Sequence, residues 1–216
     1  MGDGRGLAGV HPGAEPVMTG FLTPVTLTGE RWVRLEPLRR EHLSEIVAAA
    51  ADDEMGGLWF TAAPGAADVE RWVDARLAAQ NPDTGLTFVV RSLDDDRLIG
   101  SSSYLHADAP SRRLEIGHTW CVAPMRRTGV NTETKLLMLG HAFEQLGCVA
   151  VEFRTHFFNF ESRRAIERLG AKLDGVLRSH QLLPDGSRRD TVVYSILDIE
   201  WPAVRTHLRH RLDRHR

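Results

Sequence analysis

The sequence predicts a mixed α/β domain, with a mostly antiparallel sheet of about seven strands flanked by helices. Two patterns carry this prediction. Alternating apolar and polar residues are typical of half-buried strands, and apolar residues every three or four positions are typical of helices. The expected order is a strand, two helices, three strands, a helix, a strand, a helix, two strands and a helix. Strands joined by short turns favour antiparallel pairing.

The first part of the chain begins with a Gly- and Pro-rich segment. We expect a disordered tail over residues 1–22 and a single domain over residues 23–216. The next elements are expected to be a strand at 31–38, a helix at 39–51, a loop at 52–65 and a second helix around 69–77.

Three strands are expected next, over residues 86–92, 97–107 and 112–124. Side chains alternate between the faces of a strand, so the third strand should present two sets of residues. One face is expected to hold Leu114, Ile116, His118, Trp120 and Val122. The other face is expected to hold Glu115, Gly117, Thr119 and Cys121.

The second half is expected to contain a helix at 130–147, a buried strand at 148–155, a helix at 159–171, a hairpin at 172–197 and a basic closing helix. Gly147 and Gly170 are placed to end the two helices that precede them. The basic closing helix is typical of a solvated face, with a ribosomal or RNA contact as the alternative.

Composition narrows the class of protein. The formal net charge of −2 gives no broad footprint for nucleic acid, and no apolar run approaches the ~20 residues of a membrane span. The first 17 residues do not form a signal peptide pattern. Two cysteines, Cys121 and Cys148, indicate a reducing, cytoplasmic setting and small core side chains rather than a disulfide framework, although Cys121 could also be a reactive thiol.

A candidate anion site lies where the third strand leads into a helix, in the stretch APMRRTGVNTETKLLM at residues 123–138. A helix start gathers unpaired N–H groups and partial positive charge. Arg126 and Arg127 add guanidinium donors, and Gly129 lets the backbone approach a bulky anion. The alternative is a helix cap and turn with solvated arginines. Neither common Gly-rich nucleotide-binding motif is present.

Three segments of the sequence resemble the GNAT superfamily of N-acetyltransferases, and its RimJ/RimL-like branch in particular. They are RRTGVNTETKLLMLGHAFEQLG, VEFRTHFFNFESRRAIERLGA and GVLRSHQLLPDGSRRDTVVYSILDIEWP, and the resemblance extends over residues 27–212. The family signature maps onto Arg126, Gly129 and Asn131, where Asn131 replaces a small residue. The resemblance implies the GNAT fold, with a central strand pair that splays apart.

The resemblance also implies acetyl-CoA as co-substrate, with no metal. Its pyrophosphate is then expected on the amides of residues 127–132, beside Arg126, and its pantetheine between Trp120 or Val122 and the strand at 148–155. The cofactor-binding residues of the helix start are therefore Arg126, Arg127, Thr128, Gly129, Val130, Asn131 and Thr132. Asn159 and Ser162 match positions of the branch that contact pantetheine and sulfur, and helix capping is their alternative role.

Acetyl transfer needs a neutral amine, a donor to the thioester oxygen and, less strictly, a proton for the thiolate. Glu115 is the first candidate base, with an ion pair to Arg112 or Arg113 as its alternative role. His118 and Glu152 follow it. Ser162 is the candidate donor to the leaving thiolate.

The acceptor site is expected between the loop at 54–61 and the hairpin. Met55, Trp59, Phe60 and His118 are its candidate lining residues, with packing as their alternative role. The sequence thus predicts an acetyltransferase acting on a peptide N-terminus or a small amine, as a monomer or homodimer with no membrane contact. The alternative function is a non-catalytic CoA-binding sensor.

Overall fold

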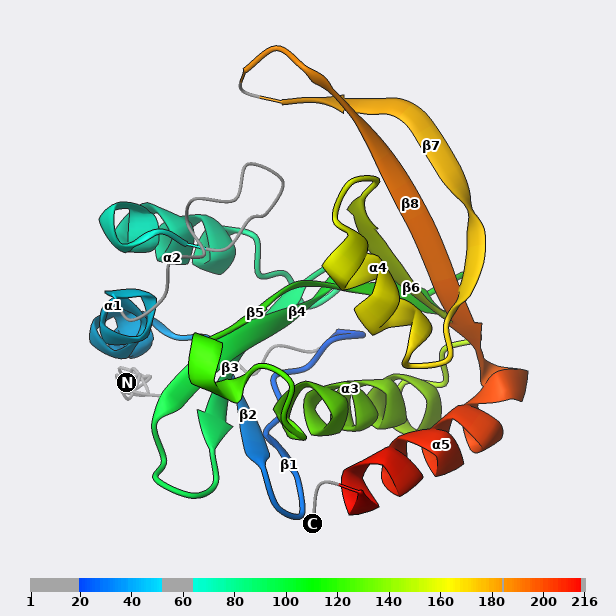
Figure 1. Cartoon of the computed structure of the whole chain (residues 1–216), viewed down its shortest axis with the longest axis horizontal. Helices are drawn as coiled ribbons and strands as arrows, with labels where there is room; N and C mark the ends of the chain where they lie inside the picture. Colours follow the sequence, from blue (N-terminus) through cyan, green and yellow to red (C-terminus); the bar gives the residue numbers. More distant parts are fainter. Residues whose placement is uncertain (1–19, 52–63, 184, 215–216) are drawn as a thin grey trace, which may run out of the picture.

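The structure is a computed structural model that describes residues 20–51, 64–183 and 185–214. Within these ranges eight strands form one sheet in the order β1-β2-β3-β4-β5-β6-β8-β7 (Figure 1). The strands are β1 (Leu27–Thr28), β2 (Val33–Pro37), β3 (Leu86–Ser92), β4 (Leu98–Asp108), β5 (Arg113–Cys121), β6 (Ala150–His156), β7 (Lys172–Leu182) and β8 (Arg188–Leu197). Every neighbouring pair is antiparallel except β5 and β6. The predicted architecture is confirmed, and the strand beyond the expected seven is the two-residue β1.

Helices cover both faces of this sheet. On one side lie α1 (Leu43–Ala51) and α2 (Val69–Ala78), and on the other lie α3 (Val130–Gly140), α4 (Phe160–Glu167) and α5 (Trp201–Asp213) (Figure 1). Both faces of β3 are buried: Phe88 and Val90 belong to the larger core under α3 and α5, whereas Val89 belongs to the core under α1 and α2. A sheet buried on both sides holds its backbone firmly, and its central strands therefore make a rigid base for a site.

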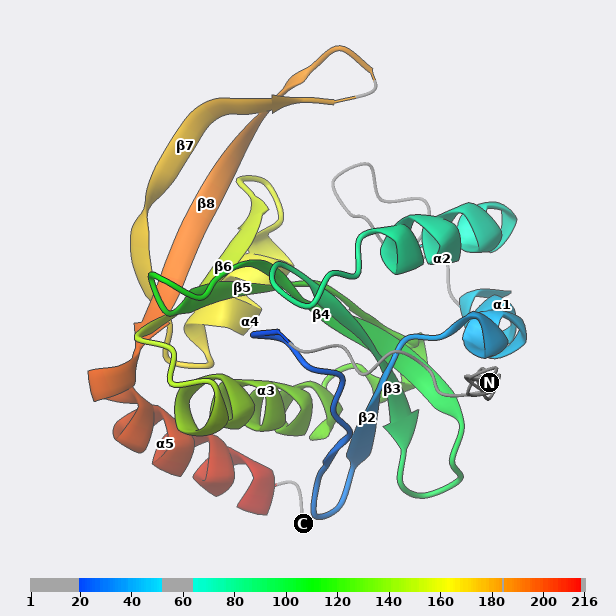
Figure 2. The same ribbon diagram turned by 180° about the vertical axis from the view of Figure 1, so that it is seen from behind.

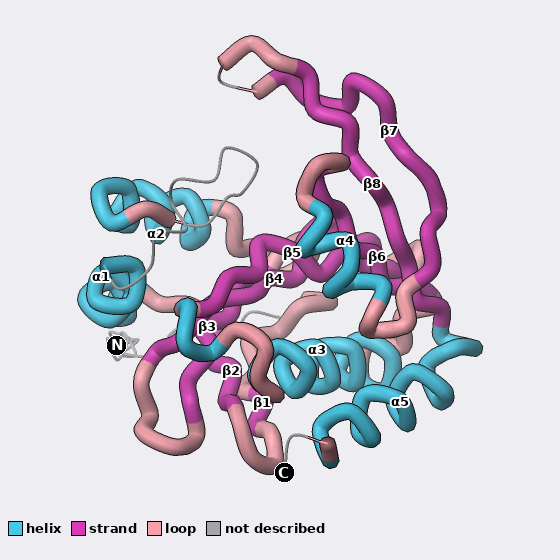
Figure 3. The backbone as a smooth tube through the Cα atoms, in the orientation of Figure 1, coloured by secondary structure: helices cyan, strands magenta, loops and turns pink. Residues whose placement is uncertain are grey.

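Local sequence signals set the element ends. Gly147 and Gly170 adopt left-handed conformations, with φ of +64° and +99°, as expected of glycines that end helices. The helix that begins at Val130 continues through a π-helical segment at His141–Gln145 before Gly147. The β7–β8 hairpin projects well beyond the rest of the molecule (Figure 3). One boundary differs from the expectation: Leu22, assigned to the tail, is fully buried and its amide donates to the Pro82 carbonyl at 2.6 Å.

A β-bulge in β5 overturns the expected alternation of its side chains. Ser101 pairs with Trp120 and Ser103 with Gly117, so β5 has one residue more than β4 between these pairs. His118 takes up the extra residue with a left-handed φ of +47°. Beyond the bulge the faces exchange. Trp120 consequently packs in the core under α1 and α2, not beside Leu114 and Ile116.

The parallel pair at the centre of the sheet separates along its length. The register of β5 with β6 covers Arg113–Ala150, Leu114–Val151 and Glu115–Glu152 only. Both strands continue past this point, β5 to Cys121 and β6 to His156. The expected splay is therefore present, and it begins directly after Glu115. The bulge lies on the part of β5 that pairs with β4 but no longer with β6, where the gap between β5 and β6 opens.

Candidate active site

Unpaired amides gather at the start of α3, where β5 leads through a short turn into the helix. The Thr128 hydroxyl donates to the Met125 carbonyl at 2.7 Å and accepts from the Val130 amide at 3.3 Å. Within the described ranges, four further N–H groups have no hydrogen-bond acceptor, those of Arg127, Gly129, Asn131 and Thr132. Such donors at the positive end of a helix dipole suit an anion. The exposed Arg126 and Arg127 add positive charge beside them.

Gly129 is required for a reason that the sequence did not suggest. A Cβ at this position would lie 2.4 to 2.9 Å from three atoms of the Trp32 indole. The space that we expected to admit an anion is therefore filled by a side chain from the start of β2. The amides remain, but the glycine serves packing between β2 and α3.

Glu133 of α3 holds the β1–β2 turn, which carries Trp32, a role that was not predicted from the sequence. Its buried carboxylate accepts four backbone N–H groups from the β1–β2 turn, at 2.7 to 3.2 Å, those of Glu30, Arg31, Trp32 and Val33. Figure 2 shows this hairpin beside the start of α3. A carboxylate that accepts several amide groups is a strong connection, so Glu133 holds Trp32 over Gly129. An acidic residue in the first turn of an amphipathic helix was the only signal available.

Lys135 lies on the face of α3 that meets the bulge of β5. Its Nζ donates to the Ser102 hydroxyl at 2.8 Å and to the Thr119 hydroxyl at 2.6 Å. No carboxylate of the described residues pairs with this buried ammonium group. Burial lowers the pKa of Lys135 to about 7. A buried amine held only by two hydroxyls therefore lies beside the bulge of β5.

Asn159 and Ser162 lie at the start of α4, beyond the end of β6. The Asn159 side-chain carbonyl accepts the Ser162 amide at 3.0 Å, which makes Asn159 the N-cap. The capping alternative therefore holds for Asn159. The cap uses the Ser162 amide and not its hydroxyl. Ser162 is half-buried, in the first turn of α4, which follows β6.

Glu115 is buried at the last pair of β5 with β6. The Glu115 Oε2 atom lies 2.9 Å from Nδ1 of His106, within hydrogen-bond distance, and 3.5 Å from Nε of Arg154. The alternative role, an ion pair of Glu115 with Arg112 or Arg113, is not found among the described residues, and Arg113 pairs with Glu152 instead. Burial raises the pKa of Glu115 above its usual range, although His106 and Arg154 oppose this effect. A cavity of about 160 Å³ borders it. A carboxylate with a raised pKa beside a cavity is suited to general base chemistry.

Glu152 and His118 are less suited to that role. Burial raises the pKa of Glu152, but hydrogen bonds and charge from Arg154 and Arg113 lower it below its usual range. His118 is not in the core as expected: the bulge turns it toward Arg76 of α2, which contacts its Nδ1. Burial, together with Arg76 and other nearby cations, lowers the pKa of His118 to about 4.

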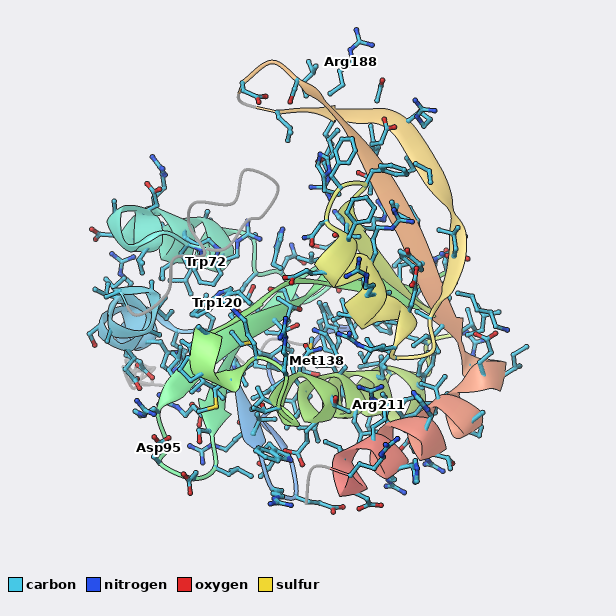
Figure 4. The ribbon with its side chains drawn as sticks, viewed as in Figure 1. Trp72, Asp95, Trp120, Met138, Arg188 and Arg211 are labelled. Carbon is cyan, nitrogen blue, oxygen red and sulfur yellow. The ribbon has the colours of Figure 1, made fainter. Side chains whose placement is uncertain are left out.

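The remaining predicted residues have mixed outcomes. Trp120 packs edge-on against Trp72 of α2, with ring centroids 6.2 Å apart (Figure 4). The backbone of Val122 is engaged inside the protein, because its amide donates to Ile99 and its carbonyl accepts from Met125. Met55, Trp59 and Phe60 lie outside the described residues. Among the residues described, no cluster of His, Cys, Asp or Glu is arranged to hold a metal ion, and no helix is long and apolar enough to cross a membrane.

Solved structures define the class of this protein. A GCN5-related N-acetyltransferase from Brucella melitensis has a TM-score of 0.77 and 31% identity, covering 88% of this chain and 86% of its own. RimJ of Mycobacterium smegmatis, solved with CoA-disulfide, shares the fold with a TM-score of 0.73 at 20% identity, covering 87% of this chain and 95% of its own. The fold is that of an N-acetyltransferase.

The sequence profile of the acetyltransferase (GNAT) domain matches residues 33–172, and the chain belongs to this family. It is also similar to YdaF of Bacillus subtilis (strain 168), whose name proposes a ribosomal N-acetyltransferase. That relative is 28% identical over 173 residues, 77% of this chain and 90% of YdaF. The resemblance read from the sequence is thereby confirmed. The protein is an acetyltransferase that uses acetyl-CoA, the acetyl donor of the family.

Proposed function

We propose that this chain transfers the acetyl group of acetyl-CoA to a primary amine, on a peptide N-terminus or a small molecule, by direct attack of the amine on the thioester. One observation carries the proposal. The β5–β6 gap begins at buried Glu115, and β5 leads from this gap into the unpaired amides of α3. The proposed diphosphate site and the candidate base thus lie at the two ends of one strand.

The residues at the start of α3 fit the diphosphate of acetyl-CoA. The amides of Arg127, Gly129, Asn131 and Thr132 are its proposed donors, and the guanidinium groups of Arg126 and Arg127 balance its charge. Val122 is a weak candidate for pairing with pantetheine, because both of its backbone groups are already bonded. The unpaired part of β5 before it is the better candidate.

Bound acetyl-CoA supplies an activated carbonyl and a thiolate leaving group. Glu115 takes the proton that the amine loses on attack, directly or through one water in the bordering cavity. The Ser162 hydroxyl donates a hydrogen bond to the departing sulfur. No covalent intermediate on the chain is required. The name of YdaF favours a peptide N-terminus as the acceptor.

Two measurements test this function. Calorimetry should detect CoA binding, and an Arg127→Glu variant should bind at least roughly ten-fold more weakly because it reverses charge beside the diphosphate. Acetyl-CoA with a panel of peptides and small amines should release free thiol and yield acetylated product. Tight CoA binding without turnover on any amine would instead support the sensor function, and absence of CoA binding would overturn both.

A further inference from the structure

Two arginines near His118, at the bulge of β5, have no carboxylate of the described residues within ion-pair distance. Arg76 of α2 is half-buried and contacts the His118 ring, and its Nε is fully buried without a hydrogen-bond acceptor. Arg189 of β8 is also half-buried, and its Nε donates to the Thr191 hydroxyl at 3.1 Å. Among the residues that the structure describes, no carboxylate lies within 4.0 Å of either guanidinium group.

Several other partly buried arginines of the described residues are matched. Arg91 lies 2.9 Å from Glu36 and 2.6 Å from Glu45, and Arg154 lies 2.9 Å from Glu152. Arg163 is matched differently, by the Tyr194 hydroxyl, the Phe157 carbonyl and two aromatic rings. A buried cation is costly unless an anion compensates it. Arg76 and Arg189, by contrast, are half-buried guanidinium groups with no carboxylate of the described residues within 4.0 Å.

Both arginines lie near the part of β5 that has separated from β6. Arg76 reaches it from α2 through its contact with His118, the residue at the bulge of β5. Arg189 reaches it from β8, beyond the last pair of β8 with β6, which joins Thr191 to His156. The charge of Arg189 acts on both His118 and Glu115, so it lies near both. Arg76 of α2 and Arg189 of β8 thus both place positive charge around His118, on the part of β5 that has separated from β6.

We propose that the acceptor carries an anionic group, a carboxylate or a phosphate, close to its reactive amine, and that Arg76 and Arg189 bind it. This inference rests on the function proposed above and specifies its substrate class. A guanidinium group can donate two hydrogen bonds to one anion, which fixes orientation as well as affinity. With the anion held between α2 and β8, the neighbouring amine lies beside Glu115. For a peptide substrate, this predicts an acidic residue close to the N-terminus.

A competition experiment tests the inference. One mixture combines three pools of short peptides, whose residues after the first position are mainly acidic, neutral or basic. A second mixture holds small amines with and without a carboxylate or phosphate. Product ratios at low conversion with acetyl-CoA give the ratios of kcat/KM directly. We expect the anionic acceptors to be preferred by roughly ten- to a hundred-fold.

Variants locate the origin of this preference. Arg76→Gln and Arg189→Gln should each reduce the preference to a few-fold while leaving CoA affinity unchanged. Arg76→Lys should retain part of it, which keeps the test available if the glutamine variant does not fold. The control is Arg71→Gln on the same helix, an exposed residue paired with Asp68, which should change nothing.

The outcomes separate the two proposals. If neutral or basic acceptors are acetylated as well as acidic ones, the inference is overturned and the transferase function stands. If the preference is present but survives both glutamine variants, the assignment to Arg76 and Arg189 is overturned. If CoA binds but no acceptor in either mixture reacts, the proposed function fails, and this inference fails with it.

Discussion

The Lys135 ammonium group lies 2.6 Å from the Thr119 hydroxyl, directly after the bulge that turns the β5 chain. Lys135 is 5% exposed, whereas Thr119 is exposed. Ser102 completes the cluster, since its hydroxyl lies 2.8 Å from that of Thr119 as well as from Lys135. The two hydroxyls can therefore bond each other without the amine. An ionisable amine is thus buried beside the bulge with two hydroxyls and no carboxylate of the described residues as partners.

This arrangement predicts that Lys135→Met is at least as stable as the parent protein near neutral pH. The variant removes a buried charge that has no carboxylate partner, and it leaves the Ser102–Thr119 bond in place. An unfolded lysine has a pKa of about 10.4, whereas burial lowers that of Lys135 to about 7. The ammonium form therefore destabilises the fold fully below about pH 7, and the effect diminishes as pH rises toward 10.

Urea unfolding at about pH 6 and about pH 9 measures this effect. The advantage of Lys135→Met should be larger at the lower pH, and the difference between the two conditions should be about 1–3 kcal/mol. Lys172→Met is the control, because Lys172 is largely exposed at the far edge of the sheet. A variant that is less stable than the parent at both pH values contradicts the prediction, and would mean that the hydroxyls depend on the amine.

Gly129→Ala should lower the free energy of unfolding by about 1–3 kcal/mol, because the new Cβ would overlap the rigid Trp32 indole. The cause can be isolated by a double-mutant cycle measured in urea. In a Trp32→Ala background the same glycine substitution should cost much less. Equal costs in both backgrounds would show that the indole is not the obstacle, and that the glycine is needed for the loop itself.

Local patterns in the sequence were enough to predict most of the elements. β3 has the predicted bounds, the Asn159 cap follows from residue type, and Gly147 ends a helix with the expected φ. These features depend on residues a few positions apart. They were therefore visible in a single sequence.

The parts that the sequence could not predict depend on residues far apart in the chain. Glu133 binds amides about 100 positions away, and the ring against Gly129 belongs to Trp32. The bulge in β5 likewise requires the register of two strands, so residue alternation alone placed His118 and Trp120 on the wrong face. Consequently the unpaired amides at the start of α3 were predicted, whereas the reason for Gly129 was not, and the anion site itself stays a prediction.

Ser162→Ala should lower kcat several-fold without changing stability or CoA affinity. The cap of α4 uses the Ser162 amide rather than its hydroxyl, so alanine preserves it. Asn159→Ala is the matched variant, and it should lower the free energy of unfolding by about 1 kcal/mol because it removes the cap. Thermal unfolding, calorimetry with CoA and steady-state kinetics separate the two effects. An unchanged kcat for Ser162→Ala would remove the hydroxyl from the mechanism.

Glu115→Gln should reduce kcat/KM by roughly a hundred-fold or more, because it removes the proposed base while keeping its shape. The pH profile gives a sharper test. Burial raises the pKa of Glu115, so the activity of the parent should rise with pH through a value above the usual ~4.3 of a glutamate, as the carboxyl loses its proton. This limb should be absent in Glu115→Gln and present in Glu152→Gln, since Arg154 and Arg113 keep Glu152 ionised to lower pH against the effect of its burial. If the limb disappears with Glu152 instead, the base lies on β6 and the amine approaches from that strand.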